Sequence, residues 1–147
     1  MLTFLNLEAE GFCSIESLHL QLNPTCTILI KAPNGKGKST ILSALVWAIY
    51  GKNLKGVSEV NTWKQVRPKD YKGTKVQVYF QKDSHTYKIV RCQKYDEVLE
   101  DGAKGKDRLI FMKDGDIVDI KGKGKIQDFI NREIGLSYTL FMNSIMF

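Results

Sequence analysis

Hydrophobic and polar residues alternate over the first part of the chain, and this alternation predicts strands. The apolar positions of the pattern are Leu2, Phe4, Leu5 and Leu7, followed by Ile15, Leu18, Leu20 and Leu22. Residues 11–14, GFCS, interrupt it, so we expect a turn between two strands there. The later run TCTILI at 25–30 is β-branched and apolar, which is typical of a strand buried on both faces of a sheet.

Helical patterns occur in two later segments. Residues 41–50 contain no charge, no proline and no glycine, so they predict a helix that packs on several sides and ends at Gly51 as its C-cap. Apolar residues at 126, 129, 130 and 134 have helical spacing, with a stop at Gly135. Ser137 is then placed as the N-cap of a final apolar segment that ends at Phe147.

Two hairpins are predicted between these helices. Residues 75–80 and 87–91 flank a polar loop at 82–85, and a weaker hairpin joins 109–112 to 117–120 across Asp114-Gly115. Residues 52–73 have little periodicity, so we expect an exposed basic connection with a short turn around Trp63. Residues 94–107 are polar and contain glycine, and we expect them to be mobile.

A glycine-rich motif lies between the run at 25–30 and the helix at 41–50. Residues 32–40, APNGKGKST, match the P-loop pattern G-x-x-x-x-G-K-[ST] with alanine in the first glycine position. Gly35 and Gly37 allow the backbone N–H groups to point inward, where a Cβ would obstruct phosphate oxygens. A helix from about Lys38 adds unpaired N–H donors and partial positive charge. The alternative is a glycine-rich turn that precedes a helix by chance.

The side chains of the motif have separate expected roles. Lys38 is placed to reach the β- and γ-phosphates, the Ser39 hydroxyl to ligate Mg²⁺, and Thr40 to lie near the α-phosphate. The predicted nucleotide site comprises Asn34, Gly35, Lys36, Gly37, Lys38, Ser39 and Thr40.

Composition and charge refine this picture. The 147 residues, 43% hydrophobic and 26% charged, are typical of one ordinary globular domain. The net charge of +6 is concentrated in residues 52–93, a stretch that contains ten basic residues and three acidic ones. This surplus indicates either a patch that faces a polyanion or a lysine-rich solvated loop.

Several classes of protein and site are disfavoured. No window has the apolar length of a membrane span, and the N-terminus carries glutamates where a signal peptide would be apolar, so we expect a cytoplasmic location. The cysteines, Cys13, Cys26 and Cys92, lack C-x-x-C spacing and are interpreted as small buried hydrophobes. We assign no catalytic role to His19 or His85.

Three segments resemble the ATPase heads of the SMC-like family. Residues 30–51, IKAPNGKGKSTILSALVWAIYG, are similar to the P-loop and following helix of these heads. Residues 76–91, VQVYFQKDSHTYKIVR, resemble a hairpin of the double-strand-break-repair branch, whose bacterial form is SbcC. Residues 141–147, FMNSIMF, resemble the segment that leads into the Q-loop of that branch. The similarity covers essentially the whole chain, and the ATPase subunit of phage recombination endonucleases is the nearest match.

This resemblance implies the fold class α/β P-loop NTPase, as the N-terminal lobe of an ABC-type ATPase head with a mixed sheet and β-hairpins. Residues 1–147 would form this lobe, with the C-terminal lobe and a coiled coil absent. The implied cofactors are ATP and Mg²⁺, and Lys38 would polarise the phosphates as the catalytic residue. The implied partners are the protein's own C-terminal lobe, a second head in a homodimer, a metallo-phosphoesterase nuclease subunit and double-stranded DNA, in the host cytoplasm if the protein is phage-encoded.

The same resemblance implies what the chain lacks. The Q-loop glutamine, the signature motif, Walker B and the switch histidine would lie beyond Phe147 or across the coiled coil, so the isolated chain is expected to be inactive. Three alternatives stay open: a small-molecule kinase, a transporter-type ABC ATPase and a non-hydrolysing assembly fragment. Kinases usually place the P-loop after the first strand, and transporter ATPases reach their Q-loop sooner.

The basic stretch supplies candidates for DNA phosphate contacts, which would be insensitive to sequence and dependent on salt. These candidates are Lys52, Lys55, Lys64, Arg67, Lys69 and Lys72. We expect Trp47, Tyr50, Tyr79 and Phe80 to pack in the core or between strands. Phe12 is a weaker candidate for a position beside the adenine.

Overall fold

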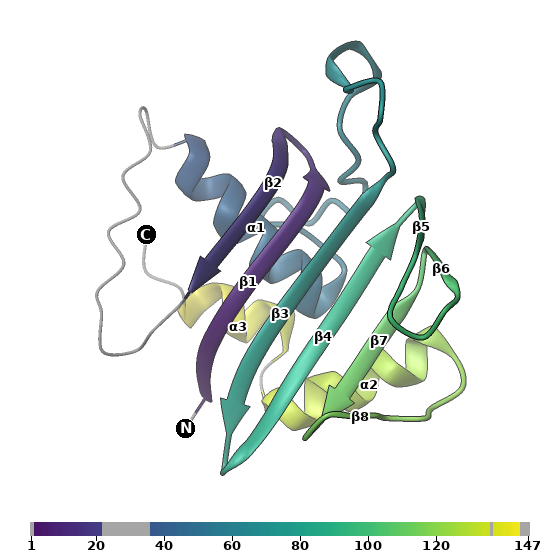
Figure 1. Cartoon of the computed structure of the whole chain (residues 1–147). Helices are drawn as coiled ribbons and strands as arrows, with labels where there is room; N and C mark the ends of the chain where they lie inside the picture. The colour runs from purple at the N-terminus through teal and green to yellow at the C-terminus, as the bar shows by residue number, and fades with distance from the viewer. Residues whose placement is uncertain (1, 22–35, 136, 145–147) are drawn as a thin grey trace.

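Six strands form one antiparallel sheet in the order β2-β1-β3-β4-β7-β8 (Figure 1). The computed structural model describes residues 2–21, 36–135 and 137–144. The strands of this sheet are β1 (Leu2–Phe12), β2 (Ile15–Gln21), β3 (Thr74–Lys82), β4 (His85–Gln93), β7 (Leu109–Lys113) and β8 (Asp116–Ile117). Sequence neighbours therefore pair as hairpins, whereas β1 with β3 and β4 with β7 pair across long connections.

Tight turns join the predicted strand pairs. The turn expected at 11–14 links β1 to β2, with Gly11 at φ 62° and Cys13 at φ 49°. In the β3–β4 hairpin, Asp83 and Ser84 both have positive φ, 51° and 68°, which suits the two-residue turn that matches the twist of paired strands. The predicted turn at 11–14 and the predicted hairpin β3–β4 are thus confirmed.

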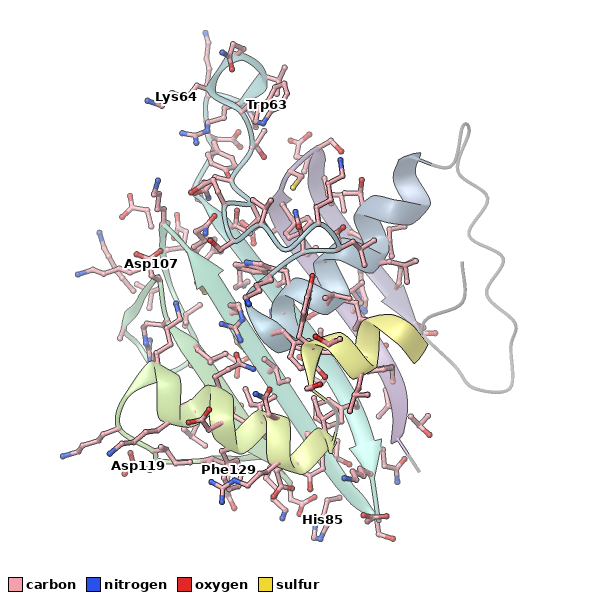
Figure 2. The ribbon with its side chains drawn as sticks, turned by 180° about the vertical axis from the view of Figure 1, so that it is seen from behind. Trp63, Lys64, His85, Asp107, Asp119 and Phe129 are labelled. Atoms are coloured by element: carbon pink, nitrogen blue, oxygen red, sulfur yellow. The ribbon has the colours of Figure 1, made fainter. Side chains whose placement is uncertain are left out.

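Three helices cover one face of the sheet (Figures 1 and 2). They are α1 (Lys36–Tyr50), α2 (Lys123–Ile134) and α3 (Tyr138–Ser144), and a 3₁₀ turn, η2 (Lys64–Val66), lies near Trp63 as expected. The predicted helix ends are confirmed, because Gly51 and Gly135 adopt left-handed φ values of 79° and 78°. The Ser137 Oγ accepts a hydrogen bond from the Leu140 N–H at 3.2 Å, as its predicted N-cap role requires.

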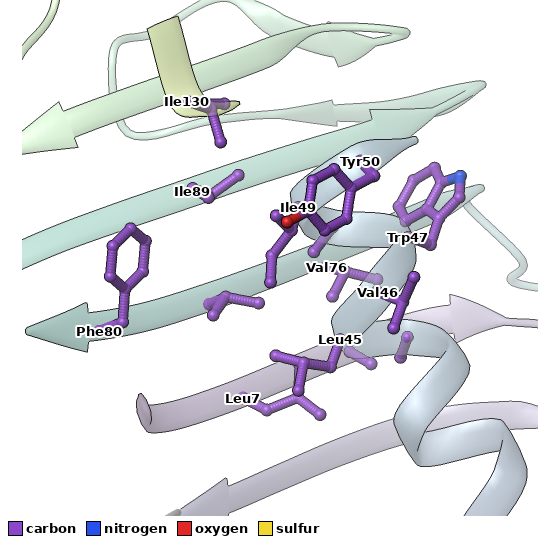
Figure 3. Close-up of a cluster of buried hydrophobic side chains, with 14 of the residues drawn as sticks. Leu7, Leu45, Val46, Trp47, Ile49, Tyr50, Val76, Phe80, Ile89 and Ile130 are labelled. Carbon is purple, nitrogen blue, oxygen red and sulfur yellow. The ribbon is translucent and has the colours of Figure 1, made fainter. Parts of the chain in front are cut away.

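The core lies between this face of the sheet and α1 (Figure 3). All seven residues at 44–50 of α1 are buried, which confirms the prediction of a helix packed on several sides. Alternate residues of β3, Val76, Val78 and Phe80, have no exposed surface and face the helix. Because this alternation sets the pairing register, a slip of one residue would turn these three side chains out of the core.

The opposite face of the sheet carries a second, smaller cluster. Strands β5 (Tyr95–Val98) and β6 (Lys104–Lys106) pair as a separate two-stranded sheet, and Tyr95 packs with Val90 and Cys92. Regular structure therefore replaces the mobile segment expected at 94–107. The signal was weak because the two strands have only four and three residues.

The last hairpin is shorter than predicted. Asp114 and Gly115 form its turn with positive φ values of 51° and 87°, but β8 contains only two residues. The strand expected at 25–30 lies outside the described residues. None of the helices in the described ranges is long and apolar enough to cross a membrane.

Candidate nucleotide-binding site

Helix α1 begins inside the glycine-rich motif. Its first residue is Lys36, so residues 36–40 form the first turn of the helix, two residues earlier than expected. Asn34 and Gly35 lie outside the described residues, as do the side chains of Lys36, Lys38 and Ser39. The half-buried Thr40 follows in the same turn. The structure thus places the second half of the motif at a helix N-terminus, as the P-loop prediction requires.

The backbone of this first turn suits a phosphate group. The first four N–H groups of an α-helix have no acceptor within the helix, and the helix dipole puts partial positive charge at the same end. No acidic residue lies in the first turn of α1, so no carboxylate there opposes an anion. Gly37 contributes one of these N–H groups and has no Cβ that could obstruct a phosphate. The residues present therefore fit a nucleotide phosphate.

The other end of α1 is held by a buried arginine from β4. Arg91 is only 5% exposed, and its Nε donates to the Ala48 carbonyl at 3.0 Å while Nη2 donates to the Ile49 carbonyl at 3.3 Å. Its guanidinium also lies 6.0 Å from the centre of the Trp47 ring. The negative end of the helix dipole favours this cation, although burial lowers the pKa of Arg91 to about 10.

Helix α2 joins the same network. The Gln127 Nε2 donates to the Ile49 carbonyl at 2.8 Å and to the Asn131 Oδ1 at 3.0 Å, while its Oε1 accepts a hydrogen bond from Arg91. Gly51 lies against the guanidinium, since a Cβ there would come within 3.1 Å of the Arg91 Nη1. These contacts fix α1 to β4 and α2 at the end remote from the motif.

Sequence reasoning missed this role of Arg91 by counting it in the basic stretch. Its signal was present in the strand periodicity, because Arg91 shares alternate positions, and hence one face, with the buried Tyr87 and Ile89.

The six candidate DNA contacts occupy three places. Lys52 lies beside α3, with its Nζ 5.5 Å from the centre of the Tyr138 ring. Lys55 is exposed in a turn, and its backbone N–H donates to the Asn53 Oδ1. The other four lie on a loop of residues 62–73, called the projection below, which extends past the ends of β1 and β3 (Figure 1). These four are Lys64, Arg67, Lys69 and Lys72.

The basic stretch 52–93 does not form one surface. Lys72 pairs with Glu97 at 2.8 Å, and Lys88 pairs with Glu100 at 3.1 Å on the face of the sheet opposite α1. Arg91 is buried beneath α1. A polyanion would therefore meet the exposed members on the projection rather than all ten basic residues.

The aromatic residues are core residues for the most part. Phe12 is fully buried, with its ring centre 5.8 Å from that of Trp47, so its position is inside the core rather than beside an adenine. Trp47, Tyr50 and Phe80 are buried as predicted. Tyr79 is half-buried on the other face, where the Lys88 Nζ lies 5.3 Å from its ring centre.

Comparison with known proteins gives a family match over nearly the whole chain. The family model described as "AAA domain" matches residues 6–147. A search of the curated proteins finds no match.

Solved structures share the fold at low sequence identity. The recombination mediator protein RecF with ATP, from the RecFOR pathway, is 21% identical, with a TM-score of 0.55 over 85% of this chain and 30% of its own. RecF solved with ATPrS is 17% identical, with a TM-score of 0.53 over 85% of this chain and 29% of its own. A structure from work on ATP-driven dimerization and DNA-stimulated activation of SMC ATPases is 21% identical. Its TM-score is 0.54 over 92% of this chain and 81% of its own.

These similarities confirm the predicted fold class, a mixed α/β lobe of a P-loop ATPase head. The chain spans only about 30% of the length of the RecF chains that it matches.

Proposed function

Because the chain belongs to the AAA domain family, we propose that it is the ATP-binding N-terminal lobe of a DNA recombination and repair ATPase of the SMC-like, SbcC type. One observation carries this proposal: the motif 32–40 continues directly into α1, and the C-terminal half of that helix fills the core. The two strands before the motif, β1 and β2, disfavour the small-molecule kinase alternative.

Each residue of the motif has a defined part in this function. Asn34, Gly35, Lys36 and Gly37 would surround the phosphates with backbone N–H groups, and Lys38 would place its charge on the β- and γ-phosphates. Ser39 would ligate Mg²⁺, whose chemistry is to neutralise charge that develops on the phosphates. Thr40 would lie near the α-phosphate.

Binding and hydrolysis are separate in this proposal. Lys38 binds and polarises the phosphates, but a group that orients the attacking water is also needed. We assign that group to a C-terminal lobe and to a second head that closes on the nucleotide. ATP turnover in the assembled protein would control a metallo-phosphoesterase nuclease that acts on the ends of double-stranded DNA.

Isothermal titration of the chain with ATP and Mg²⁺ tests the binding function. We expect the wild-type chain to bind and Lys38→Ala to bind at least about tenfold more weakly, because a charge-assisted contact contributes about 1.5–3 kcal/mol. Lys55→Ala is the matched control, since it removes an exposed lysine outside the motif. Equal affinity in wild type and Lys38→Ala would contradict the proposal.

A turnover assay tests whether hydrolysis, unlike ATP binding, needs the C-terminal lobe. The chain alone is expected to release no phosphate from ATP, and the addition of a C-terminal lobe is expected to start hydrolysis. Hydrolysis by the isolated chain that Lys38→Ala abolishes would show that the water-orienting group lies within these 147 residues. In the assembled nuclease, Lys38→Ala should remove only the ATP-dependent part of DNA cleavage.

A further inference from the structure

The projection, residues 62–73, presents an exposed tryptophan. Trp63 is 78% exposed and Val66 is 67% exposed, whereas Trp47, the other tryptophan of the chain, is 2% exposed. Trp63 and Lys64 lie at the outer end of the projection, beyond the strands of the sheet (Figure 2). A large aromatic side chain in this position needs a reason, because tryptophan is highly buried on average.

The base of the projection is firmly held. The Tyr71 hydroxyl donates to the Gly11 carbonyl at 2.9 Å and accepts from the Thr62 N–H at 2.9 Å. The Thr62 Oγ1 donates to the Cys13 carbonyl at 2.7 Å, and the Thr74 Oγ1 donates to the Gly11 carbonyl at 2.7 Å. These bonds join both ends of the projection to the turn between β1 and β2.

Arg67 extends this order toward the tip. Its Nε donates to the Thr62 carbonyl at 2.6 Å, and its guanidinium lies 4.8 Å from the centre of the Tyr71 ring. Trp63 is therefore displayed by a loop with fixed ends, so little conformational entropy is lost when it binds a partner.

Charge around Trp63 favours a polyanion. Lys64 and Lys69 are exposed near it in sequence, and Arg67 adds a third positive charge. A groove of about 560 Å³ on one side of the projection has three carboxylates, Glu10, Glu16 and Asp70, in its lining. Lys72 also lines the groove but pairs with Glu97, so phosphates are expected at Lys64, Arg67 and Lys69 rather than in the groove.

We propose that Trp63 stacks on an exposed base face of nucleic acid, at an unpaired base or a terminal base pair, while Lys64, Arg67 and Lys69 contact the adjoining phosphates. Aromatic stacking beside positive charge is the usual basis of single-strand binding without sequence preference. Paired bases inside a duplex present no free face, so the contact selects single strands and ends. This inference deepens the proposed function, because it assigns the contact with DNA ends to one side chain.

Intrinsic fluorescence can test the contact, because the two tryptophans differ so much in exposure. The wild-type chain would be titrated at low salt with a single strand of about 12 nucleotides, a blunt duplex and a covalently closed circular duplex. Fluorescence anisotropy of labelled DNA would report binding independently. We expect the single strand and the blunt duplex to quench the fluorescence, and the closed circle to bind without quenching.

Variants assign the signal to Trp63. Trp47→Phe, which leaves Trp63 as the sole tryptophan, should keep the quenching of tryptophan fluorescence, and Trp63→Phe should abolish it while most of the affinity remains. Trp63→Ala should bind the single strand about tenfold more weakly, with an unchanged salt slope because no charge is removed. Lys64→Gln with Lys69→Gln should instead lower the salt slope by about two.

DNA binding, fluorescence quenching and ATP binding together distinguish an error about the Trp63 contact from an error about the proposed function. DNA binding by anisotropy without quenching, or equal quenching by the closed circle, would overturn the stacking contact and leave DNA binding intact. Absence of any DNA binding would overturn both the contact and the DNA part of the proposed function, but not ATP binding. If Trp63→Ala kept its DNA affinity and instead abolished dimerisation in sedimentation, Trp63 would cover a second copy of the chain and the inference would be wrong.

Discussion

At the scale of single residues, Arg91 shows how a buried cation can be stabilised by main-chain acceptors. Its guanidinium donates to the carbonyls of Ala48 and Ile49, which belong to the last turn of α1. No N–H group of the helix donates to these carbonyls, and they carry the negative end of its dipole. The buried arginine and the end of the helix therefore satisfy each other's hydrogen-bonding groups.

Replacement of Arg91 tests this interpretation. Arg91→Ala should lower the free energy of unfolding by about 3 kcal/mol, because it leaves buried carbonyls without their charged donor. Urea denaturation followed by circular dichroism would measure the loss. Arg108→Ala is the matched control, since Arg108 pairs with the exposed Asp101, and little change is expected there. Equal losses in the two variants would contradict the role of Arg91.

A second residue-scale prediction concerns the thiol of Cys92. The side chain is 1% exposed, and burial raises the pKa of the thiol to about 11. Almost no thiolate is therefore present at pH 8, and we expect iodoacetamide to leave Cys92 unmodified until the chain unfolds. Peptide mass spectrometry before and after addition of urea would measure this. Labelling of Cys92 in the native chain at the rate of a free cysteine would contradict its burial.

The roles of these two residues were predictable to different degrees. Burial of Cys92 follows from its residue type alone. Arg91 lies on the inward face by strand alternation, but its acceptors are main-chain atoms 43 and 42 residues away in the sequence. Main-chain acceptors have no residue signature, so this contact could not be derived from the sequence.

At the scale of elements, the base of the projection depends on a close approach of two glycines. Gly11 has a φ of 62°, and a Cβ there would lie 2.1 Å from the Gly73 carbonyl oxygen. Both the backbone conformation and the space thus require glycine. The Gly11 carbonyl also accepts the hydrogen bonds that the Tyr71 and Thr74 hydroxyls donate.

Substitution of Gly11 should therefore loosen the projection as well as destabilise the fold. Gly11→Ala is expected to lower the free energy of unfolding by at least about 2 kcal/mol more than Gly56→Ala. Gly56 has a comparable φ of 76° but nothing within 4 Å of its Cβ position, so it isolates the effect of backbone conformation. Thermal unfolding of the two variants would give the difference, and equal losses would show that the contact with Gly73 is not needed.

Elements with strong local signals were predicted well, and those with weak signals were not. Helix α1 contains a long apolar run that ends at a glycine, and the β3–β4 hairpin has long alternating strands joined by turn residues. Strands β5 and β6 are short, and their pairing depends on the contact of Tyr95 with Val90 and Cys92 in a neighbouring strand. That contact is tertiary, so local patterning did not indicate it.

At the scale of the whole molecule, the sequence predicted hairpins but not the order in which they combine. The pairing of β1 with β3 joins Leu7 to Val78, and the pairing of β4 with β7 joins Ile89 to Phe111. Both depend on a common apolar face that α1 and α2 cover, a condition that only the complete fold fulfils. The P-loop motif needed no such context, because the predicted strand, the glycines, the lysine and the helix follow one another directly along the chain.

The position of α1 links the candidate nucleotide site to the stability of the whole lobe. Residues 36–40 of the helix belong to the motif, and residues 44–50 fill the core and receive Arg91 at their end. A ligand at the first turn therefore stabilises an element that cannot unfold without loss of the core. Ligand that binds only the folded chain at 100 times its dissociation constant adds about 2.7 kcal/mol.

Thermal unfolding with and without ATP and Mg²⁺ would measure this coupling. For a lobe of this size, we expect saturating ATP to raise the Tm of the wild-type chain by about 5–10 °C. Lys38→Ala should lose most of this shift because it weakens phosphate binding, whereas Trp63→Ala should keep it because the projection lies outside the motif. A full shift in Lys38→Ala would place ATP elsewhere on the chain. Loss of the shift in Trp63→Ala would mean that the projection contributes to nucleotide binding as well as to contact with DNA.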